Sequence, residues 1–193
     1  MARRKEFDRE YVLERAMDVF WHKGYEATSV QDLVGHMGIS RGSLYDTFGD
    51  KHSLFIAVLD RYREATASKM LQGLESPDAS LDAIRQFFKM IVVALSSQEI
   101  CKGCLVVNSM VELAGHDPQA ARSLRAHLSR MERAFYRALR RARSQGEISD
   151  RHDLHALAQF LIGTTSGLSV VAKTSPNPQV LQNMVDVALS SLQ

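Results

Sequence analysis

The first 62 residues are divided into short segments by side chains that begin and end helices. Apolar residues recur at helical spacing in each segment, with no alternation typical of a strand. A residue that can cap a helix N-terminus precedes each segment: Asp8, Ser29, Ser40 and Asp50. A glycine, which tolerates the backbone conformation at a helix end, follows each of the first three: Gly24, Gly38 and Gly49. The pattern predicts four short helices joined by tight turns.

The remainder of the chain has the same helical punctuation. The stretch 73–80, which contains Pro77, is predicted to separate two regions. Asp117 followed by Pro118 is a strong helix start, because proline fits the first helical position. Further helices are expected at about 81–95, 104–114, 117–144, 153–173 and 179–192. With no convincing strand pair, the sequence predicts an all-α fold of about nine helices.

Composition indicates a soluble globular protein. Hydrophobic residues make up 45% of the 193 residues and charged residues 24%, enough apolar material for a core and too little charge for a disordered chain. We expect no membrane association, because no apolar run reaches the ~18 residues of a membrane span. The start of the chain does not have the apolar stretch of a secretory signal. With only two cysteines, the composition predicts a cytoplasmic protein.

The segments at 29–37 and 40–48 have the layout of a helix-turn-helix. Gly38 provides the turn, and Leu33 and Leu44 are placed to pack the first helix against the second. In DNA-binding proteins of this type the N-terminal part of the second helix enters the major groove. The spacing alone leaves open that Gly38 joins two core helices of some other bundle. If the motif does bind DNA, the expected contact residues are Thr28, Ser29, Ser40, Arg41, Gly42, Ser43, Tyr45 and Lys51.

Net charge does not by itself indicate nucleic-acid binding. The chain carries a formal charge of only +2, and residues 1–51 hold eight Lys or Arg against nine Asp or Glu. Binding to DNA would depend on the placement of a few cations, chiefly Arg41, which can reach guanine edges or phosphates. Arg3, Arg4 and Lys5 form a short basic arm, which suits either phosphate and minor-groove contact or a solubilising tail.

Residues 7–62 resemble the N-terminal domain of the tetracycline-repressor (TetR) family of transcriptional regulators. The resemblance rests on Ala16, Phe20, Gly24-Tyr25, Thr28-Ser29-Val30, Asp32-Leu33, Gly38-Ile39-Ser40, Gly42-Ser43-Leu44-Tyr45, Phe48, Lys51 and Leu54. Asp46 departs from it, since many members have an aromatic or neutral residue there. The rest of the chain fits the family by length and helix count.

The resemblance implies a division of labour and an assembly. Residues 1–52 would form a three-helix DNA-binding domain, and residues 53–193 an effector-binding and dimerisation domain. A homodimer would bind double-stranded DNA at a near-palindromic operator, usually as a repressor, and a small effector would change the separation of the two DNA-reading helices. No enzyme activity, cofactor or metal is expected. The alternative is a thiol-redox or metal-responsive protein that acts without specific DNA binding.

The C-terminal half contains candidates for both the dimer and the effector site. The last helix is apolar around most of its circumference, and the helix before it contains Gly163 and Gly167, which would allow another helix to approach closely. Dimerisation or packing within one chain would explain both features. Expected effector-pocket residues, each of which could instead be ordinary core, are Phe87, Phe88, Ile91, Met110, Met131, Phe135 and Phe160.

Cys101 and Cys104 form a C-x-x-C pair just before a helix. A helix N-terminus and the adjacent Lys102 favour the thiolate, so the pair suits thiol or electrophile sensing. Glu112 and His116 are spaced to complete a metal site, whereas buried structural cysteines are the plainer alternative. His152 and His155, and the arginines Arg122, Arg125, Arg130, Arg133, Arg137, Arg140, Arg141 and Arg143, are expected to be solvent-exposed surface.

Overall fold

The computed structural model describes residues 7–97 and 102–192, and within these ranges every regular element is a helix. An N-terminal unit is formed by α1 (Arg9–Lys23), α2 (Val30–Met37), α3 (Arg41–Phe48) and α4 (Lys51–Tyr62). Helix α4 continues through a π-helical turn, η1 (Arg63–Ala67), into α5 (Ser68–Glu75). Counted as one continuous helix, α4, η1 and α5 bring the described residues to the nine helices expected.

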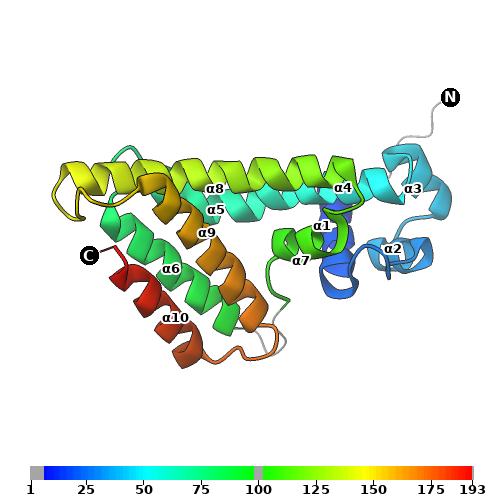
Figure 1. Cartoon of the computed structure of the whole chain (residues 1–193). Coiled ribbons are helices and arrows are strands. Elements are labelled where there is room, and N and C mark those ends of the chain that lie inside the picture. Colours follow the sequence, from blue (N-terminus) through cyan, green and yellow to red (C-terminus); the bar gives the residue numbers. More distant parts are fainter. Residues whose placement is uncertain (1–6, 98–101, 193) are drawn as a thin grey trace.

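The C-terminal unit comprises α5 and five further helices: α6 (Leu81–Ser96), α7 (Leu105–Leu113), α8 (Pro118–Ser144), α9 (Leu154–Val171) and α10 (Pro178–Ser190). Helix α8 is the longest, at 27 residues, and runs along the molecule from the N-terminal unit to the opposite end (Figure 1). It packs against α5, α6 and α9, while α10 packs against α6 and α9. Helix α7 lies between this bundle and the N-terminal unit (Figure 1).

The helix starts follow the capping residues seen in the sequence. Asp8, Ser29, Ser40, Asp50 and Asp117 each precede a helix and accept a hydrogen bond from a backbone N–H of its first turn. At Ser29 the capping box is complete, because Asp32 also accepts from the Ser29 backbone N–H at 3.0 Å. These local bonds satisfy orphan donors at the helix ends and fix where each short helix begins.

The buried side chains form two clusters that do not follow the predicted boundary at residues 52 and 53. The cluster of the N-terminal unit includes Leu54 and Phe55 of α4, and also Leu105 and Leu113 of α7 and Leu124 of α8. The core of the N-terminal unit is thus completed by helices from the second half of the chain. The two units therefore share one packed cluster of side chains.

Helix α9 also meets the length and hydropathy of a membrane span, with a mean hydropathy of 1.3 over 18 residues. A search for unbroken apolar runs misses it because glycine, threonine and serine interrupt its aliphatic residues. Length and composition are weak evidence, since a core helix of a globular protein passes the same test. In this fold α9 packs against α6, α8 and α10, which accounts for its apolar inner face.

Candidate nucleic-acid interface and internal cavity

Helices α2 and α3 are joined by a tight turn at Gly38, which requires a left-handed backbone conformation. Gly38 has φ 68° and ψ 29°, in the left-handed region, and its N–H donates to the carbonyl oxygen of Val34 at 3.0 Å. Ser40 then caps α3 by accepting from the Ser43 backbone N–H. Leu33 and Leu44 are fully buried, so α2 braces α3 through apolar contact. This is the helix-turn-helix that the sequence predicts.

Helix α3 lies at one end of the molecule (Figure 1), and its outer face is polar. Arg41, Gly42, Tyr45 and Asp46 are exposed, while Leu44 and Phe48 point into the core. The Arg41 guanidinium lies 5.8 Å from the centre of the Tyr45 ring and donates to its hydroxyl at 3.5 Å. The two side chains most suited to contact DNA therefore lie together on the first two turns of α3.

The other predicted contact residues have their side chains engaged in the local structure. Thr28 is buried and donates its hydroxyl to the carbonyl oxygen of Gly24. Ser29 is held in the capping box, and Ser40 and Ser43 share a hydrogen bond of 2.9 Å between their hydroxyls. The Lys51 ammonium lies 4.3 Å from the centre of the Tyr25 ring. Among the predicted contact residues, Thr28 is the one with a buried side chain.

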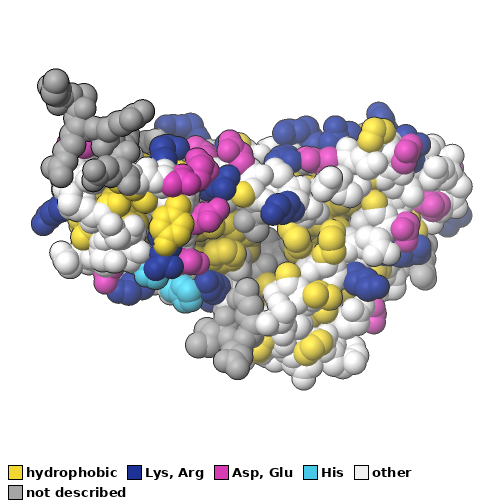
Figure 2. Space-filling model, turned by 180° about the vertical axis from the view of Figure 1, so that it is seen from behind, with side chains coloured by type: hydrophobic (Ala, Val, Ile, Leu, Met, Phe, Trp, Pro, Cys, Tyr) yellow, Lys and Arg dark blue, Asp and Glu magenta, His cyan; other side chains and the backbone are white. Residues whose placement is uncertain are grey.

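Charges on the N-terminal unit are balanced locally. Asp32 accepts from Lys23 at 2.6 Å, and this bond, with those from Ser29, lowers the pKa of Asp32 well below its usual range. Arg61 pairs with Glu10 at 3.0 Å and with Glu14 at 3.1 Å. Basic and acidic side chains are interspersed on the face drawn in Figure 2. There is accordingly no broad basic patch on that face, as the charge count indicated.

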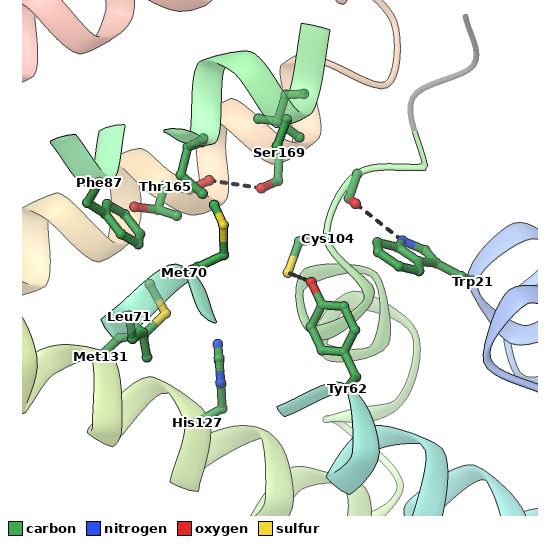
Figure 3. Close-up of a pocket in the computed structure, with 14 residues that line it drawn as sticks. Trp21, Tyr62, Met70, Leu71, Phe87, Cys104, His127, Met131, Thr165 and Ser169 are labelled. Atoms are coloured by element: carbon green, nitrogen blue, oxygen red, sulfur yellow. Dashed lines mark hydrogen bonds between the residues drawn. The ribbon is translucent and has the colours of Figure 1, made fainter. Parts of the chain in front are cut away.

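A cavity of about 150 Å³ lies between the two units (Figure 3). Helix α1 contributes Trp21 to its wall and α4 contributes Tyr62, while the remaining lining residues come from α5, α6, α8, α9 and the pair Gly103 and Cys104. The described lining includes no Asp, Glu, Lys or Arg. Its apolar wall is formed largely by Met70, Leu71, Phe87, Ile91, Leu95 and Met131. An uncharged cavity in contact with α1 and α4 is a candidate effector site.

Three of the seven predicted pocket residues line this cavity: Phe87, Ile91 and Met131. Phe88 and Phe135 are fully buried in the C-terminal core instead, where they stack on one another with 6.1 Å between ring centres. Met110 packs against the N-terminal cluster, and Phe160 is 48% exposed on the outside of α9. Hydrophobicity placed these side chains in helices correctly but could not indicate which face lines a cavity.

Sequence reasoning missed the polar members of the lining. They are Tyr62, His127, Thr165 and Ser169. Thr165 and Ser169 donate to carbonyl oxygens one turn earlier in α9, at 2.9 and 3.0 Å. His127 is 6% exposed, and its Nδ1 has no hydrogen-bond partner. A single histidine among the apolar residues of α8 was the available signal.

Cys104 lies in the cavity wall at the start of α7. Its Sγ is 3.5 Å from the Tyr62 hydroxyl, and the side chain is half-buried (Figure 3). Burial, and then the nearby Cys104, raise the pKa of Tyr62 well above its usual value. The tyrosine is thus a neutral hydroxyl beside the sulfur. Cys101, the other half of the predicted pair, lies outside the described residues, as does the arm at residues 3–5.

Residues 102–104 connect the cavity to α1. The indole N–H of Trp21 donates to the carbonyl oxygen of Gly103 at 3.2 Å, and Lys102 pairs with Asp18 at 3.3 Å. Lys102 also lies 5.6 Å from the centre of the Trp21 ring. The segment just before α7 is therefore attached to α1 by a hydrogen bond and an ion pair.

Glu112 of α7 makes a second connection. Its two carboxylate oxygens accept from the backbone N–H groups of Tyr25 and Glu26 at 3.0 and 2.8 Å. Gly24 has φ 83°, and a Cβ there would approach the Glu112 carboxylate to 3.0 Å. Glu112 is thus committed to the turn after α1, and His116 pairs with Glu26 at 3.7 Å. No group of three His, Cys, Asp or Glu able to hold a metal occurs among the described residues.

A third connection joins the start of α4 to the start of α8. His52 Nε2 lies 2.7 Å from Asp117 Oδ2, while Asp117 Oδ1 accepts from the Gln119 and Ala120 N–H groups. One carboxylate therefore caps α8 and holds the N-terminal unit.

Comparison with known proteins matches both parts of the chain to a single family. Residues 12–58 match the family model for bacterial regulatory proteins of the tetR family, and residues 80–188 match that for the tetracyclin repressor-like C-terminal domain. The HTH-type transcriptional regulator YezE of Bacillus subtilis is 42% identical over 193 residues, covering all of both chains. The HTH-type transcriptional repressor ComR of Escherichia coli is 33% identical over 97% of this chain and 90% of its own.

Solved structures agree with this assignment. A cysteine-substituted form of the TetR-family regulator CifR, in complex with a 26-bp operator, superposes with a TM-score of 0.86 at 32% identity, covering 99% of this chain and 100% of the other. The matched family and relatives are transcriptional regulators and not enzymes. Together with the helix-turn-helix formed by α2 and α3, these matches establish that the chain belongs to the TetR family of DNA-binding transcriptional regulators.

Proposed function

We propose that the protein is a cytoplasmic, homodimeric repressor that is released from a near-palindromic operator when its internal cavity is occupied or modified. The observation that carries the proposal is the position of the cavity. Trp21 and Tyr62, from the unit that contains the helix-turn-helix, form part of the wall of a site otherwise built by the C-terminal unit. A ligand there contacts both units at once, so its binding energy can favour one relative arrangement over another.

The coupling required is modest. A shift of about 1–3 kcal/mol between the two arrangements changes operator affinity about 5- to 150-fold. The bonds from Trp21 to Gly103 and from Lys102 to Asp18 are positioned to transmit such a shift to α1. Helix α1 packs on α2 and α4, so its movement changes where α3 is presented.

Footprinting of the promoter DNA upstream of the protein's own gene tests operator binding. We expect a protected site with two-fold symmetry at moderate salt, because two half-sites about one helical turn apart require a dimer. Absence of any protected site would support the alternative, a thiol-responsive protein that does not bind DNA specifically.

The outer stripe of α9 and α10 is the surface that we assign to dimerisation. Phe160, Val170 and Val187 are 48%, 51% and 71% exposed, and a Cβ at Gly163 would contact nothing within 4 Å. Exposed apolar side chains beside an open glycine favour close packing of a second copy. Val187→Lys should convert a dimer to a monomer in light-scattering mass measurements. Val111→Lys, at an 84%-exposed valine on α7, is the matched control and should leave the dimer intact.

Thiol modification is the second route of release from DNA that we propose. Cys104 is the cysteine of the C-x-x-C pair that lies within the described residues. Its position in the cavity wall, beside the hydroxyl of Tyr62, means that an adduct on Sγ occupies the same space as a ligand. Cys104→Ser and Cys101→Ser should each be compared with the wild type for operator release by N-ethylmaleimide. Unchanged release in both variants and in their combination would remove the thiol route.

A further inference from the structure

The volume of the cavity between the two units limits the size of the molecule that can occupy it. Its volume is about 150 Å³, and apolar cavities of roughly that volume in other proteins hold a benzene-sized molecule. Phe87, Ile91 and Met131 provide the apolar contact surface. A molecule of about one ring therefore fits without rearrangement of the helices.

Charge restricts the occupant further. The described lining contains no ionisable carboxylate, ammonium or guanidinium group to pair with an ionised ligand. The cations around the cavity have partners outside the lining: Arg130 binds both oxygens of Glu75 at 2.7 and 2.6 Å, and Arg63 pairs with Asp60 at 3.1 Å. Lys102, beside Gly103, pairs with Asp18 at 3.3 Å. An ionised ligand would lose hydration and find no opposite charge in the described lining, so the cavity favours an uncharged one.

His127 is the polar side chain that the fold leaves unpaired in this wall. Its ring rises from α8 toward the cavity, between Met131 and Tyr62 (Figure 3). Burial, and then the charges of Arg130 and Arg63, lower the pKa of His127 to about 4, so the ring is neutral at pH 7. A neutral imidazole offers one donor and one acceptor, and the buried Nδ1 has no partner in the protein.

We infer that the cavity binds an uncharged molecule of about one ring in size that carries a single hydrogen-bonding oxygen group, and that His127 bonds to that group. The inference rests on the proposed function in taking this cavity as the effector site. It assigns His127 as the residue that selects among neutral ligands, while the apolar wall provides most of the contact area. The Tyr62 hydroxyl and the Cys104 thiol lie in the same wall and are hydrogen-bonded to each other.

Fluorescence of Trp21 measures occupancy directly, because it is the only tryptophan of the chain and lines the cavity. Three probes share a ring and differ in polar group: toluene, benzyl alcohol and benzoate. We expect the full-length protein at pH 7 to bind benzyl alcohol at least tenfold more tightly than either of the other two. Equal or tighter binding of benzoate, or no binding of any probe, would overturn the inference.

Variants identify the residue responsible. His127→Leu should bind toluene and benzyl alcohol with similar affinity, because it removes the polar partner and keeps an apolar wall. His155→Leu removes an exposed imidazole of α9 outside the lining and should preserve the wild-type preference. Persistence of the preference in His127→Leu would contradict the assignment. If that variant does not fold, the comparison of benzyl alcohol with benzoate on the wild type still decides the ligand class.

The same titration, repeated with operator DNA bound, separates this inference from the proposed function. Binding of benzyl alcohol without loss of DNA leaves the ligand class in place and counts against release through the cavity. Release of DNA by N-ethylmaleimide, with none of the probes bound, supports the function and overturns the ligand class.

Discussion

At the scale of single residues, the side chains between the two units have roles that their local sequence does not suggest. Glu112 and His116 have the spacing of a metal-ligand pair, yet Glu112 holds two backbone N–H groups of the turn after α1. Trp21 and Tyr62 have the spacing of ordinary core positions, yet they form part of the cavity wall. Their partners lie 42 to 87 residues away in the chain, and no local pattern encodes such a contact.

Replacing Glu112 by Gln should weaken the attachment of the N-terminal unit. A neutral amide keeps one acceptor oxygen where the carboxylate has two, and a hydrogen bond to a charged group contributes about 1.5–3 kcal/mol. We expect a loss of about 1–2 kcal/mol in the free energy of unfolding, measured with urea. Glu64→Gln, at an exposed carboxylate, is the control. Equal effects of the two substitutions would show that Glu112 does not hold the units together.

His127 should make stability depend on pH. Its pKa is lowered to about 4 in the folded protein against 6.5 when unfolded, so the unfolded chain binds more protons between these values. Stability is therefore greatest above pH 6.5 and falls as pH drops toward 4. Between pH 7 and pH 5, urea unfolding should show the wild type losing about 2 kcal/mol more than His127→Leu. Parallel losses in the two proteins would mean that His127 is not the group responsible.

At the scale of elements, local chemistry determined most of what could be predicted. Capping side chains and helix-ending glycines located α1 to α4 and the start of α8, because those bonds are made within one turn of the helix. The π-helical turn η1 between α4 and α5 was not predicted, since residues 63–67 contain no glycine, proline or capping pattern that would mark an irregular turn. The cavity was predicted in part, through Phe87, Ile91 and Met131, because helical spacing assigns a buried face but not its neighbour.

Two glycines of α2 and its following turn should respond oppositely to alanine. Gly38 has φ 68°, so Gly38→Ala should cost about 1 kcal/mol although its Cβ would meet nothing within 4 Å. Gly35 lies inside α2 with equally open surroundings, and Gly35→Ala should stabilise by about 0.5–1 kcal/mol through helix propensity. Thermal unfolding of both variants measures the signs. The same sign at both positions would contradict the geometry of this turn.

At the scale of the whole molecule, the N-terminal and C-terminal units share side-chain packing and a continuous helix. The N-terminal core is completed by α7 and α8, and α4 runs on into α5, so few movements of one unit leave the other unchanged. The cavity lies beside these junctions, at the side chains of Trp21 and Tyr62. Under the proposed function, this arrangement would let a small occupant alter the presentation of α3 at one end of the molecule.

The central claim is that the outer face of α3 binds DNA through a few well-placed side chains rather than through a basic patch. Fluorescence anisotropy with a labelled duplex from upstream of the protein's own gene tests it most directly. Arg41→Ala should weaken binding about tenfold or more, because an arginine on a base edge contributes about 1–3 kcal/mol. Arg137→Ala, at an exposed arginine on α8, should leave the affinity within about twofold. Equal effects of the two substitutions, or no binding by the wild type at moderate salt, would contradict the account.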